Sequence, residues 1–129
     1  MTESIKNVVV VGAGGMGALF GSILAEGGLD VTLVDNDREH VDAIRKSGLH
    51  ISGLGGERHQ QIRAEYDAGA VATADIVLFQ CKGTATFDAA KALAHLAGTG
   101  AIFVSFQNGL GNEDILAAHF GIENVLGGL

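Results

Sequence analysis

The sequence is short of several residue types on which other classes of protein depend. It has no proline and no tryptophan, and Cys81 is its single cysteine, so no disulfide can form within the chain. No cysteines and histidines have the spacing of a zinc site, and we expect no metal centre. Basic residues are scarce, with 8 against 15 acids and a net charge of -7, which disfavours nucleic acid as a partner. These absences favour a reducing, cytoplasmic setting.

Long hydrophobic runs are also absent, apart from one stretch. Residues 8–25 carry no charge over 18 positions, but five of these residues are glycines that separate two apolar ends. This pattern favours a strand, a loop and a helix in series over a membrane-spanning helix. Glu3 and Lys6 give a mixed N-terminus, and Glu26 stands where a signal peptide needs small residues. We therefore expect a soluble chain with no membrane partner.

The rest of the sequence alternates between runs of β-branched residues and segments in which apolar residues recur at helical spacing. With 129 residues and 47% hydrophobic composition, the chain suits one domain spanning residues 1–129. Strands are predicted at residues 5–11, 31–34, 76–79, 101–104 and 125–126. Apolar residues at helical spacing predict three helices between these strands. The first contains Leu19, Phe20, Ile23 and Leu24, and the second contains Val41 and Ile44. The third has one side formed by Phe87, Ala90, Leu93, Ala94 and Ala97.

The expected ends of these helices support the same alternation. Asp37 and Asn112 are suited to capping the second and the last helix, while Gly27 and Gly48 suit the ends of the first two. A weaker hairpin is predicted from residues 49–51 and 61–63. The pattern as a whole predicts an α/β fold of the Rossmann type: a doubly wound, mostly parallel sheet with helices on both faces.

The loop between the first strand and the first helix carries the strongest functional signal. It fits the pattern G-x-G-x-x-G, at the place between strand and helix where that pattern has meaning. The first glycine permits a tight turn, the second lets the backbone approach a pyrophosphate, and the third lets the helix pack closely on the strand. Phosphates would face the free N–H groups of the helix N-terminus. The predicted dinucleotide-binding residues are Gly12, Ala13, Gly14, Gly15, Met16 and Gly17.

Asp35 follows the second strand, 23 residues after Gly12, near the spacing of the acid that binds the adenosine ribose. Its carboxylate would accept hydrogen bonds from the ribose hydroxyls and repel a 2′-phosphate, which favours NAD over NADP. Arg38 leaves the alternative open, because it is either a solvated arginine in the first turn of a helix or a ligand for a 2′-phosphate.

Two polar residues follow later strands, where ligands of an open parallel sheet collect. Lys82 is suited to holding an anionic group, and the Asn108 amide offers both a donor and an acceptor. A solvated charge and a turn residue are their structural alternatives. Cys81 is interpreted as a small buried residue, and each of the five histidines as structural or solvated: His40, His50, His59, His95 and His119.

Together these residues resemble the N-terminal domain of the ketopantoate reductases (2-dehydropantoate 2-reductases), over nearly the whole chain. The resemblance rests on the glycine loop, on Lys82, on the run Gln107-Asn108-Gly109-Leu110-Gly111-Asn112-Glu113 and on Leu126-Gly127-Gly128. It implies hydride transfer from a nicotinamide dinucleotide to the ketone of 2-dehydropantoate in pantothenate biosynthesis. It also implies that Lys82 and Asn108 are catalytic and cofactor-binding residues beside the nicotinamide and the substrate.

The sequence departs from the family in two ways. Family members commonly use NADPH and often have a basic residue after the second strand, where this chain has Asp35 and Asn36. The family also has a second, helical domain, which supplies a lysine as general acid and a glutamate that binds substrate, and that domain is absent here. The resemblance therefore implies that this chain binds a dinucleotide by itself, but binds a small 2-keto acid substrate only together with that domain. Alone it is expected to turn over poorly or not at all, and to be prone to pair with another chain.

Three alternatives stay open at this point. The chain is consistent with a domain of another NAD-dependent 2-ketoacid or hydroxyacid dehydrogenase, or with a non-catalytic module that senses NAD. A methyltransferase is less consistent, since Gly17 favours a pyrophosphate. The sequence leaves undecided the cofactor preference, the substrate side chain, the oligomeric state and whether residues follow Leu129.

Overall fold

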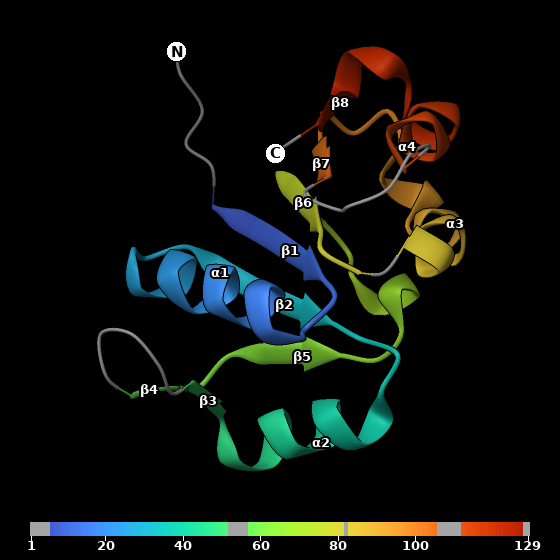
Figure 1. Ribbon diagram of the computed structural model, residues 1–129. Coiled ribbons are helices and arrows are strands. Elements are labelled where there is room, and N and C mark those ends of the chain that lie inside the picture. The colour runs from blue at the N-terminus through green and yellow to red at the C-terminus, as the bar shows by residue number, and fades with distance from the viewer. Residues whose placement is uncertain (1–5, 52–56, 82, 106–111, 128–129) are drawn as a thin grey trace.

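A six-stranded parallel sheet forms the centre of the molecule. The computed structural model describes residues 6–51, 57–81, 83–105 and 112–127. The strands lie in the order β5-β2-β1-β6-β7-β8, and every neighbouring pair is parallel (Figure 1). Their bounds are β1 (Asn7–Val11), β2 (Asp30–Val34), β5 (Arg63–Glu65), β6 (Ile76–Phe79), β7 (Ile102–Ser105) and β8 (Val125–Gly127). Numbered along the chain, the six strands of this sheet have the order 3-2-1-4-5-6, which is typical of the doubly wound fold that the sequence predicts.

Helices cover both faces of the sheet. Helices α1 (Gly15–Glu26) and α2 (Arg38–Ser47) lie on one face, and α3 (Gly83–Ala92) and α4 (Asn112–Phe120) lie on the other (Figure 1). The valines of β1 alternate between two cores: Val8 and Val10 face α1 and α2, while Val9 and Val11 face α3 and α4. A strand buried on both sides needs a continuous apolar run, which explains why this strand was predictable.

Helix α1 lies where its spacing predicts, but small residues face the sheet. Gly17, Ala18, Gly21 and Ser22 are buried, whereas Ile23 is 47% exposed. A Cβ atom on Gly17 would collide with the Gly12 carbonyl oxygen, and one on Gly21 would lie 2.7 Å from Leu33 Cδ2. The helix backbone therefore approaches β1 and β2 more closely than any larger side chain would allow.

Helix α2 has the ends and the buried face that the sequence predicts. The Asp37 side chain accepts a hydrogen bond from the His40 N–H at 3.2 Å, which caps the helix. Val41 and Ile44 are buried, and Gly48 ends the helix with φ of +82°. Helix α4 begins at Asn112, the residue predicted to cap it, and the capping contact stays a prediction because the side chain of Asn112 lies outside the described part.

The predicted apolar side of α3 is partly wrong. The helix ends at Ala92, and a 3-10 turn, η2 (Ala94–Leu96), follows it. Phe87 is 53% exposed, and both Ala94 and Ala97 are exposed. From residue 86 to residue 97, the buried residues are Thr86, Ala90, Leu93 and Leu96, which repeat at spacings of four and three. Burying Leu96 removes more apolar surface from water than burying two alanine methyls, so the tightened turn is favoured.

The predicted hairpin exists, but its second strand was placed too late. Strand β3 (Leu49–Ile51) pairs antiparallel with β4 (Arg58–Gln60). Residues 63–65 instead form β5, an edge strand of the main sheet that the sequence did not predict. The strand consists of Ala64, its one buried residue, between two charged residues, so its sequence lacks the apolar pattern that predicts a strand.

The connection from β5 to β6 contains a 3-10 turn, η1 (Ala68–Ala70), and no α-helix. It leaves a groove of about 250 Å³ over β1, β2 and β5, with Thr32 and Val71 in its lining. A further 3-10 turn, η3 (Ile122–Asn124), precedes β8. Within the described residues, no helix has the length and apolar character needed to cross a membrane.

The close approach of α1 gives a test of the packing. Gly17→Ala is expected to lower the free energy of unfolding by roughly 1–3 kcal/mol, because its Cβ meets backbone that cannot move aside. Gly14→Ala is the matched control, since a Cβ at Gly14 has nothing within 4 Å. Urea unfolding of the two variants beside the parent measures the difference. Equal stability of both variants would contradict this packing.

Candidate functional site

The ends of three neighbouring strands meet at the glycine loop. Gly12 follows β1, and its N–H donates to the Val34 carbonyl at the end of β2 at 2.7 Å. A Cβ at Gly12 would lie 2.7 Å from the Cys81 nitrogen, just after β6, and the residue has φ of +104°. Both the conformation and the close approach require glycine here. The loop therefore lies at the carboxyl end of the sheet, where open α/β folds bind their ligands.

Gly14 forms an exposed, uncapped start of α1. It is the N-cap residue, and no side chain caps the helix there. Its carbonyl accepts from the Ala18 N–H at 2.8 Å, while its own N–H has no acceptor among the described residues. A Cβ at Gly14 would point into open space. The free N–H groups of this helix end are thus accessible to an anion.

Asp35 is held beside this loop before any ligand binds. Its Oδ2 accepts from the Ala13 N–H at 2.8 Å, and its Oδ1 accepts from the Asp37 N–H at 2.9 Å. Asp35 is partly buried and follows β2 directly. Each carboxylate oxygen can accept a further hydrogen bond. The carboxylate therefore has fixed orientation and spare acceptor capacity.

His40 is a member of this cluster that the sequence analysis did not place in the site. Its Nε2 lies 2.7 Å from the Ala13 carbonyl oxygen. The carbonyl only accepts, so Nε2 carries the proton in this hydrogen bond. His40 occupies the first turn of α2, three residues after the cap, and no spacing between histidines marks it. Its position in the turn after Asp35 and Asp37 is the one signal that points to it.

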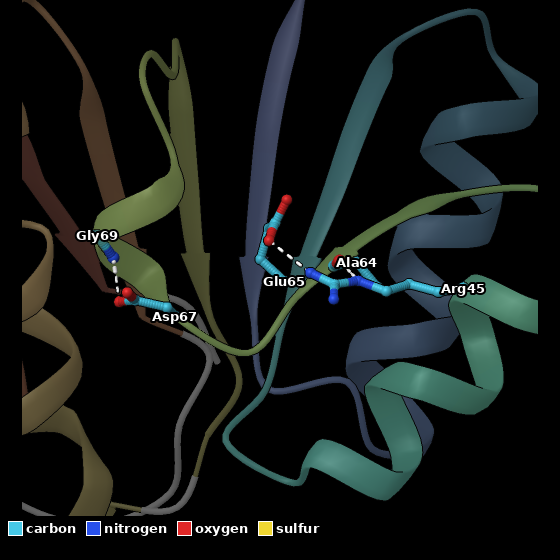
Figure 2. Close-up of polar contacts among 5 residues, drawn as sticks. All are labelled: Arg45, Ala64, Glu65, Asp67 and Gly69. Atoms are coloured by element: carbon cyan, nitrogen blue, oxygen red, sulfur yellow. Dashed lines mark hydrogen bonds and ion pairs between the residues drawn. The ribbon is translucent and has the colours of Figure 1, made fainter.

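Arg38 packs on an aromatic ring. Its guanidinium carbon lies 4.5 Å from the centre of the Tyr66 ring, and that of Arg45 lies 4.9 Å from the same centre. Figure 2 shows Arg45 reaching from α2 to β5, where it donates to the Ala64 carbonyl at 2.8 Å and to the Glu65 carboxylate at 2.6 Å. Two cations of α2 therefore contact the Tyr66 ring, which follows β5 directly.

Other predicted site residues are described only in part. Lys82 and Asn108 lie outside the described residues, and Gly15 and Met16 are described as helical backbone without their side chains. Cys81 is partly buried, and burial raises the pKa of its thiol, against which a hydrogen bond with Thr86 acts. A thiol of raised pKa is a poor nucleophile, in agreement with its interpretation as a small packing residue. The described part contains no cluster of three or more metal-binding side chains.

Similar proteins share this fold and this part of the sequence. The family model described as ketopantoate reductase PanE/ApbA matches residues 8–129. The 2-dehydropantoate 2-reductase of Halobacterium salinarum is 38% identical over 122 residues, which are 94% of this chain and 40% of that protein. That of Pyrococcus abyssi is 35% identical over 83% of this chain and 34% of its own length.

Solved structures of similar proteins also match this chain over a part of their length. The 2-dehydropantoate 2-reductase of Geobacter metallireducens superposes with a TM-score of 0.86 at 30% identity, over 95% of this chain and 40% of that one. D-mandelate dehydrogenase with NADH and anilino(oxo)acetate superposes with a TM-score of 0.87 at 26% identity, over 94% of this chain and 40% of that one.

The chain therefore spans about 40% of the length of these relatives. Within that part, the family model matches nearly every residue, and the described structure has the doubly wound parallel sheet that the sequence predicts, with the glycine loop between β1 and α1. On this evidence the chain belongs to the ketopantoate reductase family.

Proposed function

We propose that residues 1–129 form a domain that binds a nicotinamide dinucleotide as part of a 2-dehydropantoate 2-reductase-like oxidoreductase. The observation that carries the proposal is the fixed Asp35 carboxylate beside an uncapped, exposed helix start. A carboxylate for ribose hydroxyls and free N–H groups for phosphates are what a dinucleotide requires at this edge of the sheet. D-mandelate dehydrogenase, which has the same fold here, is described with NADH.

The described residues fit such a cofactor. An added Cβ at Gly14 would project into open space, so the glycine leaves room for a pyrophosphate against the backbone. Gly12, Ala13 and Gly14 would line the phosphates, with the N–H groups of Gly15, Met16 and Gly17 at the helix start. Lys82 and Asn108 are proposed to lie beside the nicotinamide and the substrate, on the strength of the family resemblance.

The preferred cofactor in this proposal is NAD(H). A 2′-phosphate would approach the Asp35 carboxylate, and two backbone hydrogen bonds keep that carboxylate in place. The cation that would favour a 2′-phosphate, Arg38, packs on Tyr66 instead. Repulsion by the fixed Asp35 charge, with the Arg38 guanidinium held over the Tyr66 ring, disfavours NADP(H) in this proposal.

The proposed reaction is reduction of a 2-keto acid. A reduced nicotinamide would supply hydride to the carbonyl carbon, and the new alkoxide would take up a proton to give a 2-hydroxy acid. In this chain Lys82 would hold the anionic substrate and Asn108 would orient the reacting groups by hydrogen bonds. We assign protonation of the alkoxide to a part of the relatives' sequence outside the 40% that this chain matches. We place the reaction in the cytoplasm because the single cysteine suits a reducing compartment.

A neighbouring substrate class has specific support. The structure of D-mandelate dehydrogenase contains anilino(oxo)acetate, a 2-oxo acid derivative with an aromatic substituent. This favours a second candidate within the same chemistry, an NAD-dependent reductase of other 2-keto acids. The two candidates share the dinucleotide site and differ in the substrate side chain.

The first prediction from this proposal concerns cofactor choice. Calorimetric titration of the chain with NADH and, separately, with NADPH should give tighter binding of NADH, because Asp35 accepts from the ribose hydroxyls and repels the added phosphate. Tighter binding of NADPH would contradict the assigned role of Asp35. Binding of neither ligand by the folded chain would contradict the proposed function.

The second prediction separates Asp35 from the overall charge. Asp35→Asn should weaken NADH binding by about tenfold, the effect of losing a hydrogen bond to a charged group, and should reduce the preference for NADH over NADPH. Asp42→Asn is the matched control, because it removes the same charge from an exposed position on α2. The ratio of the two dissociation constants is measured for each variant. An equal change of that ratio in both variants would show that only net charge matters.

A further inference from the structure

His40 holds one specific peptide group of the glycine loop. Its Nε2–H donates to the Ala13 carbonyl oxygen at 2.7 Å, while the N–H of the same residue donates to Asp35 at 2.8 Å. Ala13 is therefore fixed through both of its backbone polar groups. One of these contacts comes from the acid after β2 and the other from the first turn of α2.

The orientation of the Ala13 carbonyl determines that of the next N–H. The described residues contain no cis peptide bond, and in a trans peptide the carbonyl and the following N–H point in opposite directions. With the Ala13 carbonyl turned toward His40, the Gly14 N–H points away from α2. This N–H has no acceptor among the described residues, and Gly14 is exposed.

We infer that His40 is a positioning residue that fixes the Ala13–Gly14 peptide so that the Gly14 N–H faces the pyrophosphate of the dinucleotide. The inference rests on the proposed function and adds a residue to its site. Without the hydrogen bond from His40, that peptide is free to rotate, and the rotation must be reversed each time a ligand binds. A group fixed beforehand avoids this loss of freedom on binding.

A purely structural role would also explain a histidine bonded to a backbone carbonyl, and the chain contains such a case. His95 Nε2 donates to the Val71 carbonyl at 2.6 Å, in the connection before β6 and away from the glycine loop. The two contacts have the same chemistry and similar length. Removing the His95 contact therefore shows how much stability and NADH affinity are lost when such a hydrogen bond has only a structural role.

The experiment compares His40→Leu, His40→Gln and His95→Leu in the full chain. Dissociation constants for NADH are measured by calorimetry, and adenosine, which has the ribose without phosphates, is titrated by NMR. We expect His40→Leu to weaken NADH binding roughly five- to tenfold, the effect of one lost hydrogen bond, and to leave adenosine binding unchanged. His40→Gln should restore most of the NADH affinity, because its amide nitrogen supplies the same donor.

The controls decide between positioning and folding. Urea unfolding confirms that each variant is folded at the titration temperature, and His95→Leu should keep the parent's affinity for NADH whatever stability it loses. Equal loss of NADH affinity in His40→Leu and His95→Leu would overturn the inference. So would an equal loss for NADH and adenosine, or a failure of His40→Gln to restore binding.

The amide resonances test the clamp separately from the proposed function. In the chain without ligand, His40→Leu should shift the Gly14 amide signal, because the Ala13–Gly14 peptide changes its orientation, and His40→Gln should restore the signal to its position in the parent. If the parent bound no dinucleotide, the proposed function would fail while these signals still reported on the peptide. An unchanged Gly14 signal in His40→Leu would overturn the clamp itself.

Discussion

The Asp35 carboxylate joins the three elements that make the site. One oxygen holds the loop after β1 through the Ala13 N–H, and the other holds the start of α2 through the Asp37 N–H. The residue itself follows β2, so a single side chain sets the relative placement of strand, loop and helix. A carboxylate held by two backbone N–H groups has a fixed orientation. In the proposed site, the cost of ordering this side chain is thereby met during folding rather than on binding.

Much of the fold was predictable because burial on both faces leaves a strong mark in the sequence. The valines of β1 form an unbroken run because each face of the strand packs against a helix layer. The edge strand β5 was missed because Ala64 is its one buried residue, and the side of α3 was misassigned because alanine is weakly informative about burial. Short edge strands and alanine-rich helices are placed by tertiary packing more than by local preference.

The backbone geometry of the candidate site was predictable where a motif fixes it, whereas contacts between segments that are distant along the chain were not. The ligand-binding roles of these residues stay predictions. The glycines at 12, 14 and 17 stand at spacings that the turn and the helix contact demand, and Asp35 follows at the expected distance along the chain. His40 was interpreted as structural or solvated because its contact with Ala13 joins residues 27 positions apart, which no periodicity reveals. The assignments of Lys82 and Asn108 stay predictions that rest on family resemblance.

The helix-free connection between β5 and β6 has a consequence for engineering. Ala72 and Thr73 are exposed and border the groove, at the opposite end of the β6 strand from the glycine loop. Exposed positions in a connection are where inserted sequence disturbs a fold least. An added helix or reporter peptide at this junction would find an open stretch of sheet to pack on. The junction is thus a suitable fusion point at the opposite end of the sheet from the candidate site.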